Sequence, residues 1–96
     1  MNWNRSDNKA LIKAFLALTT QDEMRRFIRD LLTEGEIEEF AKRFKTARML
    51  VKKIPYSTIE EETGLSSTTI ARVARWLHKG AGGYRLVLGR LKHPTR

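Results

Sequence analysis

Two short helices joined by a tight turn are predicted by residues 56–76, which read YSTIEEETGLSSTTIARVARW. Gly64 lies where the chain must reverse, and glycine takes a positive φ without steric cost. The apolar residues that can then face one core are Ile59, Leu65, Ile70 and Val73. This spacing, with small polar residues and arginines on the second helix, is typical of a helix-turn-helix that contacts DNA.

The remaining sequence has helical periodicity and no strand signal. The predicted helices span about residues 7–18, 21–32, 34–53, 55–64, 66–78 and 84–92. The fold class is therefore all-α, with about six helices, of which the fourth and fifth form the helix-turn-helix.

Local start signals set these boundaries. Thr20 to Glu23 and Thr33 to Glu36 have the spacing of capping boxes, in which each end of the motif satisfies a free backbone amide of the other. Ser57 to Glu60 offers a third box, but Pro55 could equally occupy the first turn of that helix. Either Ser66 or Ser67 caps the fifth helix.

The charge is unevenly distributed along the 96 residues. The net charge is +8, with 19 Lys and Arg against 11 Asp and Glu. All of the excess lies in residues 41–96, where 13 bases face 3 acids, whereas residues 1–40 have 6 bases and 8 acids. A basic half that includes the helix-turn-helix favours a polyanionic partner, although a basic surface can also serve solubility alone.

Several functional classes lack support in the sequence. The chain has no cysteine, which excludes disulfides and thiolate metal sites and fits a cytoplasmic location. His78 and His93 have no ligand partners at metal spacing, so no metal is expected. The acidic clusters coincide with the first turns of helices, where negative charge is stabilising, and no catalytic residues are predicted. No apolar run is long enough to span a membrane.

The second helix of the motif has a buried and a displayed side. Ile70, Val73 and Leu77 form the inward stripe. The displayed hydroxyl and cationic groups suit the major groove, where arginine can bind guanine through two hydrogen bonds. The residues predicted to contact bases are Ser67, Thr68, Thr69, Arg72 and Arg75.

A second group of residues is predicted to contact phosphates. These residues are Lys52, Lys53, Tyr56, Ser57, Ser66 and Lys79. Most lie at or before the first helix of the motif, which crosses the DNA backbone in proteins of this kind. Two alternatives remain: the serines before the fifth helix can act only as caps, and the lysines can form a solvated basic patch.

Three helices before the motif are more than a compact helix-turn-helix needs. Phe15, Phe27, Phe40 and Phe44 offer more aromatic surface than one thin monomer easily covers, so these helices are expected to pack against a second copy. The alternative is a monomeric bundle. The chain is treated as a single domain, 1–96, with dimerisation helices in 6–54 and 83–93 and a helix-turn-helix head in 55–79.

Two segments resemble a known family. LLTEGEIEEFAKR at residues 31–43 and STTIAR at residues 67–72 look like the Trp repressor superfamily, and especially its small YerC/YecD-type branch. The similarity covers about residues 10–92. It implies an intertwined homodimer whose two heads address a palindromic operator.

The same resemblance implies an effector pocket. Two arginines that hold the corepressor indole in the family match Arg43 and Arg72, and Thr33 and Thr69 match other pocket positions. Val73 departs from the family's glycine and would fill the space of the ligand, so tryptophan is not expected to bind and any other effector is unknown.

The motif also departs from the common helix-turn-helix pattern at two positions. Glu60 occupies a place where a small residue often packs, and Thr63 one where an aliphatic residue is usual. Both departures suggest a loosely packed head.

The function predicted from these observations is sequence-specific binding of double-stranded DNA by a bacterial transcription regulator. Repression by a homodimer on a palindromic operator is favoured. The alternative is a basic helical module that binds protein or RNA without operator specificity. No constellation of residues supports an enzyme.

Overall fold

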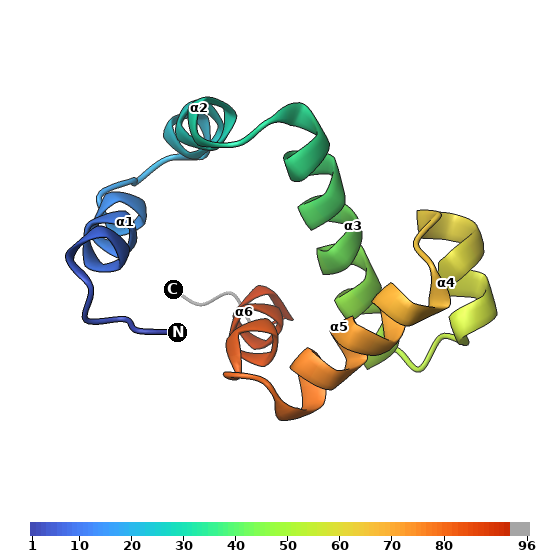
Figure 1. Ribbon diagram of the computed structural model, residues 1–96. Coiled ribbons are helices and arrows are strands. Elements are labelled where there is room, and N and C mark those ends of the chain that lie inside the picture. The colour runs from blue at the N-terminus through green and yellow to red at the C-terminus, as the bar shows by residue number, and fades with distance from the viewer. Residues whose placement is uncertain (93–96) are drawn as a thin grey trace. The chain divides into compact units, whose positions relative to one another are not determined.

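The computed structural model describes residues 1–92, and within them every regular element is an α-helix. The helices are α1 (Ser6–Leu16), α2 (Gln21–Leu31), α3 (Glu34–Val51), α4 (Tyr56–Thr63), α5 (Ser67–Lys79) and α6 (Gly83–Lys92), as Figure 1 shows. The predicted all-α class with six helices is confirmed. His93, the last residue of the predicted segment 83–93, lies outside the described residues. Over residues 1–92, no helix is both long and apolar enough to cross a bilayer.

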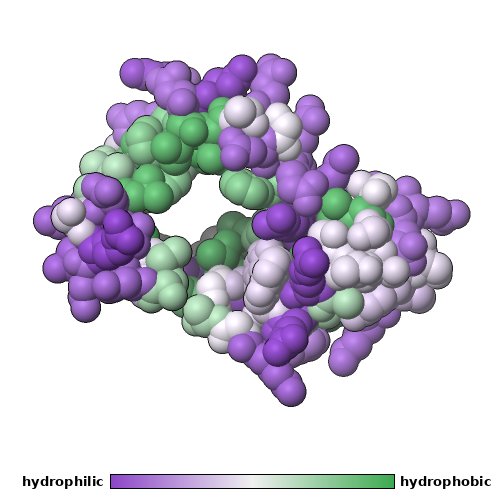
Figure 2. Space-filling model, in the orientation of Figure 1, coloured by the Kyte–Doolittle hydropathy of each residue, from purple (hydrophilic) through white to green (hydrophobic). Residues whose placement is uncertain are grey.

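The chain divides into two compact units, the first of which is Met1–Ile37. It contains α1, α2 and the first turn of α3. The rings of Phe15 and Phe27 meet edge to face at a centroid distance of 5.3 Å, which is a favourable aromatic geometry. None of the residues of α1 or α2 is buried in the described chain. Hydrophobic side chains gather on the surface of these two helices in Figure 2.

The second unit begins at Glu38 and contains the rest of α3 with α4, α5 and α6. Its core is the cluster Met49, Ile59, Leu65 and Ile70, with Leu50 and Ile54 packed against it. Val73 and Leu77 of α5 are also buried. The prediction that the apolar residues of the helix-turn-helix share one core is confirmed.

The helix starts agree with the predicted caps in part. Thr33 and Glu36 form the complete box: the Thr33 amide donates to Glu36 Oε1 at 2.9 Å, and the Glu36 amide donates to Thr33 Oγ1 at 3.1 Å. Thr20 caps α2 as predicted, but the Glu23 carboxylate accepts from Thr19, one residue further back than a capping box requires.

At α4 the structure follows neither alternative as stated, because the helix begins at Tyr56. Pro55 is the N-cap residue, and its carbonyl accepts from the amides of Thr58 and Ile59, each at 3.1 Å. No side-chain hydrogen bond caps this helix, so Ser57 and Glu60 do not form a box.

The end of α3 has a Schellman motif. The amide of Lys53 donates to the Leu50 carbonyl at 3.0 Å, and the amide of Ile54 donates to the Met49 carbonyl at 3.1 Å. Lys53 therefore has a φ of 63°, in the left-handed region. Glycine usually occupies this position, and its absence explains why the sequence predicted a helix running to Lys53.

Candidate nucleic-acid interface

The turn between α4 and α5 is fixed by its own backbone and by one buried hydroxyl. Gly64 caps α4 at a φ of 74°, and its amide donates to the Glu60 carbonyl at 2.8 Å. Thr63 Oγ1 donates to the Ile59 carbonyl at 2.7 Å and accepts from the Leu65 amide at 3.1 Å. Thr63 is only 5% exposed, so the prediction of loose packing is wrong at this residue. Glu60 is exposed.

α5 is held by one face and displays the other. Ile70 and Val73 are fully buried and Leu77 is 3% exposed, so this stripe packs α5 against the rest of the second unit. The exposed polar residues of α5 that were predicted to contact DNA are Ser67, Thr68, Arg72, Arg75 and Lys79. Thr69 is half-buried. α5 has no acidic residue, so the charged groups on its exposed face are all cationic, and they lie beside hydroxyl groups and the exposed ring of Trp76.

At the start of α5, one serine caps the helix and the next two residues are exposed. Ser66 is the N-cap residue, and its Oγ accepts from the Thr69 amide at 3.2 Å and lies 3.1 Å from Thr69 Oγ1. The capping alternative therefore holds for Ser66, and a phosphate contact by Ser66 remains a prediction. Ser67 and Thr68 are exposed at the first turn, where the amides of a helix N-terminus favour an anion.

The other predicted phosphate contacts lie around the start of α4. Lys52 and Lys53 follow the last residue of α3, whereas Tyr56 and Ser57 form the first turn of α4; all four are exposed. An ion pair of 3.6 Å between Lys45 and Glu62 links α3 to the end of α4.

The residues of the predicted effector pocket have partners of their own. The Arg43 guanidinium lies 5.6 Å from the ring centroid of Phe40 and 5.8 Å from that of Trp76, which is cation–π distance. Arg43 Nε is buried and 3.4 Å from Glu39 Oε2, without hydrogen-bond geometry. Sequence spacing did not predict the contact with Trp76, because Arg43 and Trp76 lie on different helices and are 33 residues apart in the sequence. No periodicity reports such a contact.

The other residues of the predicted effector pocket, and Val73 beside them, have different environments. The Thr33 hydroxyl caps α3 in the first unit, whereas Arg72 is exposed on α5. Val73 is fully buried. Burial raises the pKa of the Tyr84 hydroxyl, and the positive charge of Arg43 opposes that rise. Tyr84 therefore lies close enough to Arg43 to be influenced by its charge.

Residues 1–92 contain no group of three His, Asp or Glu side chains placed to hold a metal ion.

Comparison with known proteins gives one consistent result. The family model described as Trp repressor protein matches residues 6–92. The uncharacterized protein YerC of Bacillus subtilis (strain 168) is 43% identical over 82 residues, which is 85% of this chain and 79% of YerC.

Two solved structures are similar over nearly their full length. A TrpR like protein from Eubacterium eligens ATCC 27750 has a TM-score of 0.89 at 37% identity, covering 95% of this chain and 94% of that one. A structure from Staphylococcus aureus has a TM-score of 0.88 at 33% identity, covering 100% of this chain and 99% of that one.

Proposed function

The chain belongs to the Trp repressor family, a family of DNA-binding transcription regulators, and from this membership we propose that it binds a palindromic operator as a homodimer and represses transcription there. The exposed face of α5 is the main support. It presents Arg72 and Arg75 with Ser67 and Thr68 on a helix whose opposite side is buried.

The roles follow from chemistry and position. Arg72 and Arg75 read guanine edges in the major groove, where two parallel N–H donors match O6 and N7. Ser67, Thr68 and Thr69 approach bases with the N-terminus of α5. Phosphate contacts that position the head come from Lys52, Lys53, Tyr56, Ser57, Ser66 and Lys79.

The exposed apolar side chains of the described chain support the homodimer. Leu11, Ile12 and Leu16 of α1 are 40%, 45% and 77% exposed. Leu86 and Leu91 of α6 are 53% and 62% exposed. Apolar surface of this extent, on helices that bury nothing of their own, is typical of an interface between copies. Residues 6–54 and 83–93 provide this interface, and residues 55–79 form the head.

Binding to the operator does not require tryptophan. Val73 is packed into the core at the position where the family has a glycine, and Arg43 already has two aromatic neighbours, Phe40 and Trp76. Titration calorimetry with tryptophan is expected to show no binding at micromolar concentration. Saturable micromolar binding would show that Val73 leaves room for the ligand.

The function is tested first by selecting bound duplexes from a random pool. A two-fold symmetric consensus with half-sites about one helical turn, roughly 34 Å, apart is the expected result. A preference for structured RNA, or retention of every duplex alike, would instead favour a basic interaction module without operator specificity.

The role of Arg75 is tested on the selected operator. Arg75→Ala is expected to cost about 1–3 kcal/mol at one operator position while sparing binding to random duplexes. Arg5→Ala is the matched control, because it removes the same charge from an exposed position before α1, outside the head and the dimerisation helices. A uniform loss across all duplexes would place Arg75 among the phosphate contacts.

A further inference from the structure

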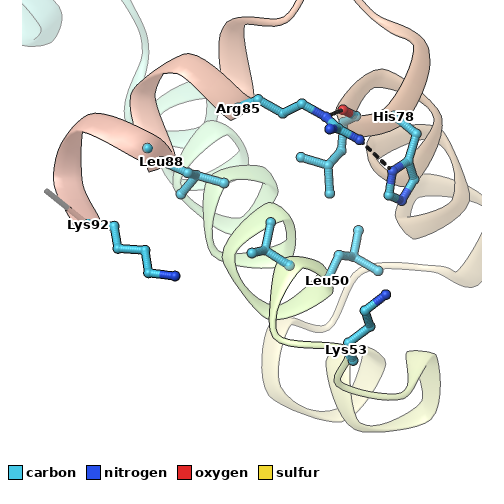
Figure 3. Close-up of a pocket in the computed structure, with 9 residues that line it drawn as sticks. Leu50, Lys53, His78, Arg85, Leu88 and Lys92 are labelled. Carbon is cyan, nitrogen blue, oxygen red and sulfur yellow. Dashed lines mark hydrogen bonds between the residues drawn. The ribbon is translucent and has the colours of Figure 1, made fainter.

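A cavity lies between α3, α5 and α6 within the second unit (Figure 3). Its volume is about 380 Å³, which is within the range of small-molecule sites. Apolar and cationic side chains share its wall, among them Leu50, Leu77, Leu88, Lys53, Arg85 and Lys92. None of its described lining residues is acidic.

Arg85 orders one end of this cavity. Its Nε donates to the Leu77 carbonyl at 2.8 Å, and its Nη2 lies 3.1 Å from His78 Nδ1. The Leu77 carbonyl is one of the last four of α5, which have no partner within the helix, so Arg85 caps α5 from α6. The guanidinium is thereby held at the cavity with donors left for a further anion.

Lys53 is placed at the cavity by a backbone conformation that disfavours lysine. Its φ of 63° is strained for a residue with a Cβ, and glycine would adopt it freely. Strain of this kind is concentrated at functional positions. In Figure 3, Lys53, which follows the end of α3, and Lys92 of α6 flank Leu50 and Leu88.

The exposed apolar residues of α1 and α6 that were named as support for the homodimer do not line the cavity. Arg85, Leu88, Gly89 and Lys92 line it with helical spacing, whereas Leu86, Val87 and Leu91 lie on the opposite side of α6. The cavity also shares no residue with the effector pocket implied by the family resemblance.

We propose that this cavity binds a small organic anion with an apolar body. The leucine side chains receive the body, and Lys53, Lys92 and Arg85 bind the carboxylate or phosphate head. Charge complementarity excludes a cation and makes a neutral apolar molecule a poorer fit.

Calorimetry with octanoate tests the site, and octanamide is the matched neutral probe. Octanoate is expected to saturate one site per chain with at least about tenfold higher affinity than octanamide, because only the carboxylate gains charge-assisted hydrogen bonds. Amide shifts at His78 and Gly89, which line the cavity, locate the site by NMR. Equal affinities, no saturable binding, or shifts confined to other regions would overturn the proposal.

Two variants separate the site from a general effect of charge. Lys53→Gly is expected to weaken octanoate about tenfold without lowering the melting temperature, because glycine relieves the strained φ. Lys92→Gln should weaken it similarly. Lys52→Gln is the control, since Lys52 adjoins Lys53 but does not line the cavity. An equal loss in Lys52→Gln would contradict a defined site. None of these measurements uses DNA, so their outcome is independent of operator binding.

Discussion

The side chain of Thr63 supplies the hydrogen-bond acceptor for a backbone amide in the turn between α4 and α5. The Leu65 amide, just after the reversal at Gly64, has its acceptor in the Thr63 hydroxyl. The same hydroxyl donates to the Ile59 carbonyl, so both of its bonds are made inside the core. An aliphatic residue would fill this space equally well but could not accept from the amide.

Replacing Thr63 with valine is therefore expected to destabilise the protein by about 1–2 kcal/mol, because a buried amide loses its acceptor. Thr46→Val is the matched control: Thr46 is fully buried, and its hydroxyl bonds only to the Lys42 carbonyl of its own helix. Urea unfolding of both variants at one protein concentration measures the difference. The explanation fails if Thr63→Val is as stable as Thr46→Val.

At the scale of elements, predictability depended on whether the signal was local. The inward stripe of α5 and the cap at Thr33 follow from spacing, and the structure contains both. The end of α3 was misplaced because a lysine occupies the left-handed position at residue 53.

The parts of the site that join distant segments gave no sequence signal. The contact between Arg43 and Trp76, and the cavity beside Arg85, depend on how α3, α5 and α6 pack together. Periodicity identifies the face of a helix that is buried, but it does not identify the neighbour of that face.

The start of α2 gives a pH-dependent prediction. Hydrogen bonds from the Thr19 amide and hydroxyl lower the pKa of Glu23 from its ordinary value of 4.5. A lowered pKa in the folded state means that Glu23 contributes stability above the ordinary value and loses this contribution as the pH falls through the folded pKa.

Glu23→Gln is expected to lower the melting temperature at neutral pH, and this difference should shrink below pH 4.5. Circular dichroism melts across the acid range provide the measurement. Asp30→Asn removes the same charge near the other end of α2, where a negative charge opposes the helix dipole, so it should not destabilise. A Glu23→Gln deficit that stays constant with pH would contradict the assigned hydrogen bonds.

At the scale of the whole molecule, the two units differ in how they bury apolar surface. In the second unit, Ile59 and Ile70 of the helix-turn-helix head share a buried core with Met49 of α3. α1, α2 and α6 have no buried residue in the described chain. A second copy would supply the missing cover and would also duplicate α5, which a palindromic operator requires.

Sedimentation equilibrium is expected to give about twice the mass of one 11.1 kDa chain. Leu11→Glu should raise the dimer dissociation constant at least about 100-fold, because the interface would have to bury an unpaired carboxylate. Leu91→Glu makes the same test on α6. Lys13→Gln is the control for α1, since it changes the charge by the same amount and lies on the other side of that helix from Leu11.

The same variants separate assembly from DNA contact. A monomeric Leu11→Glu protein should retain a helical circular dichroism spectrum. Its affinity for an operator with two half-sites should fall far more than its affinity for a single half-site, because the two heads are no longer joined in one dimer. Wild-type protein that sediments as one chain, or a Leu11→Glu protein that remains paired, would show that the exposed side of α1 serves a different purpose.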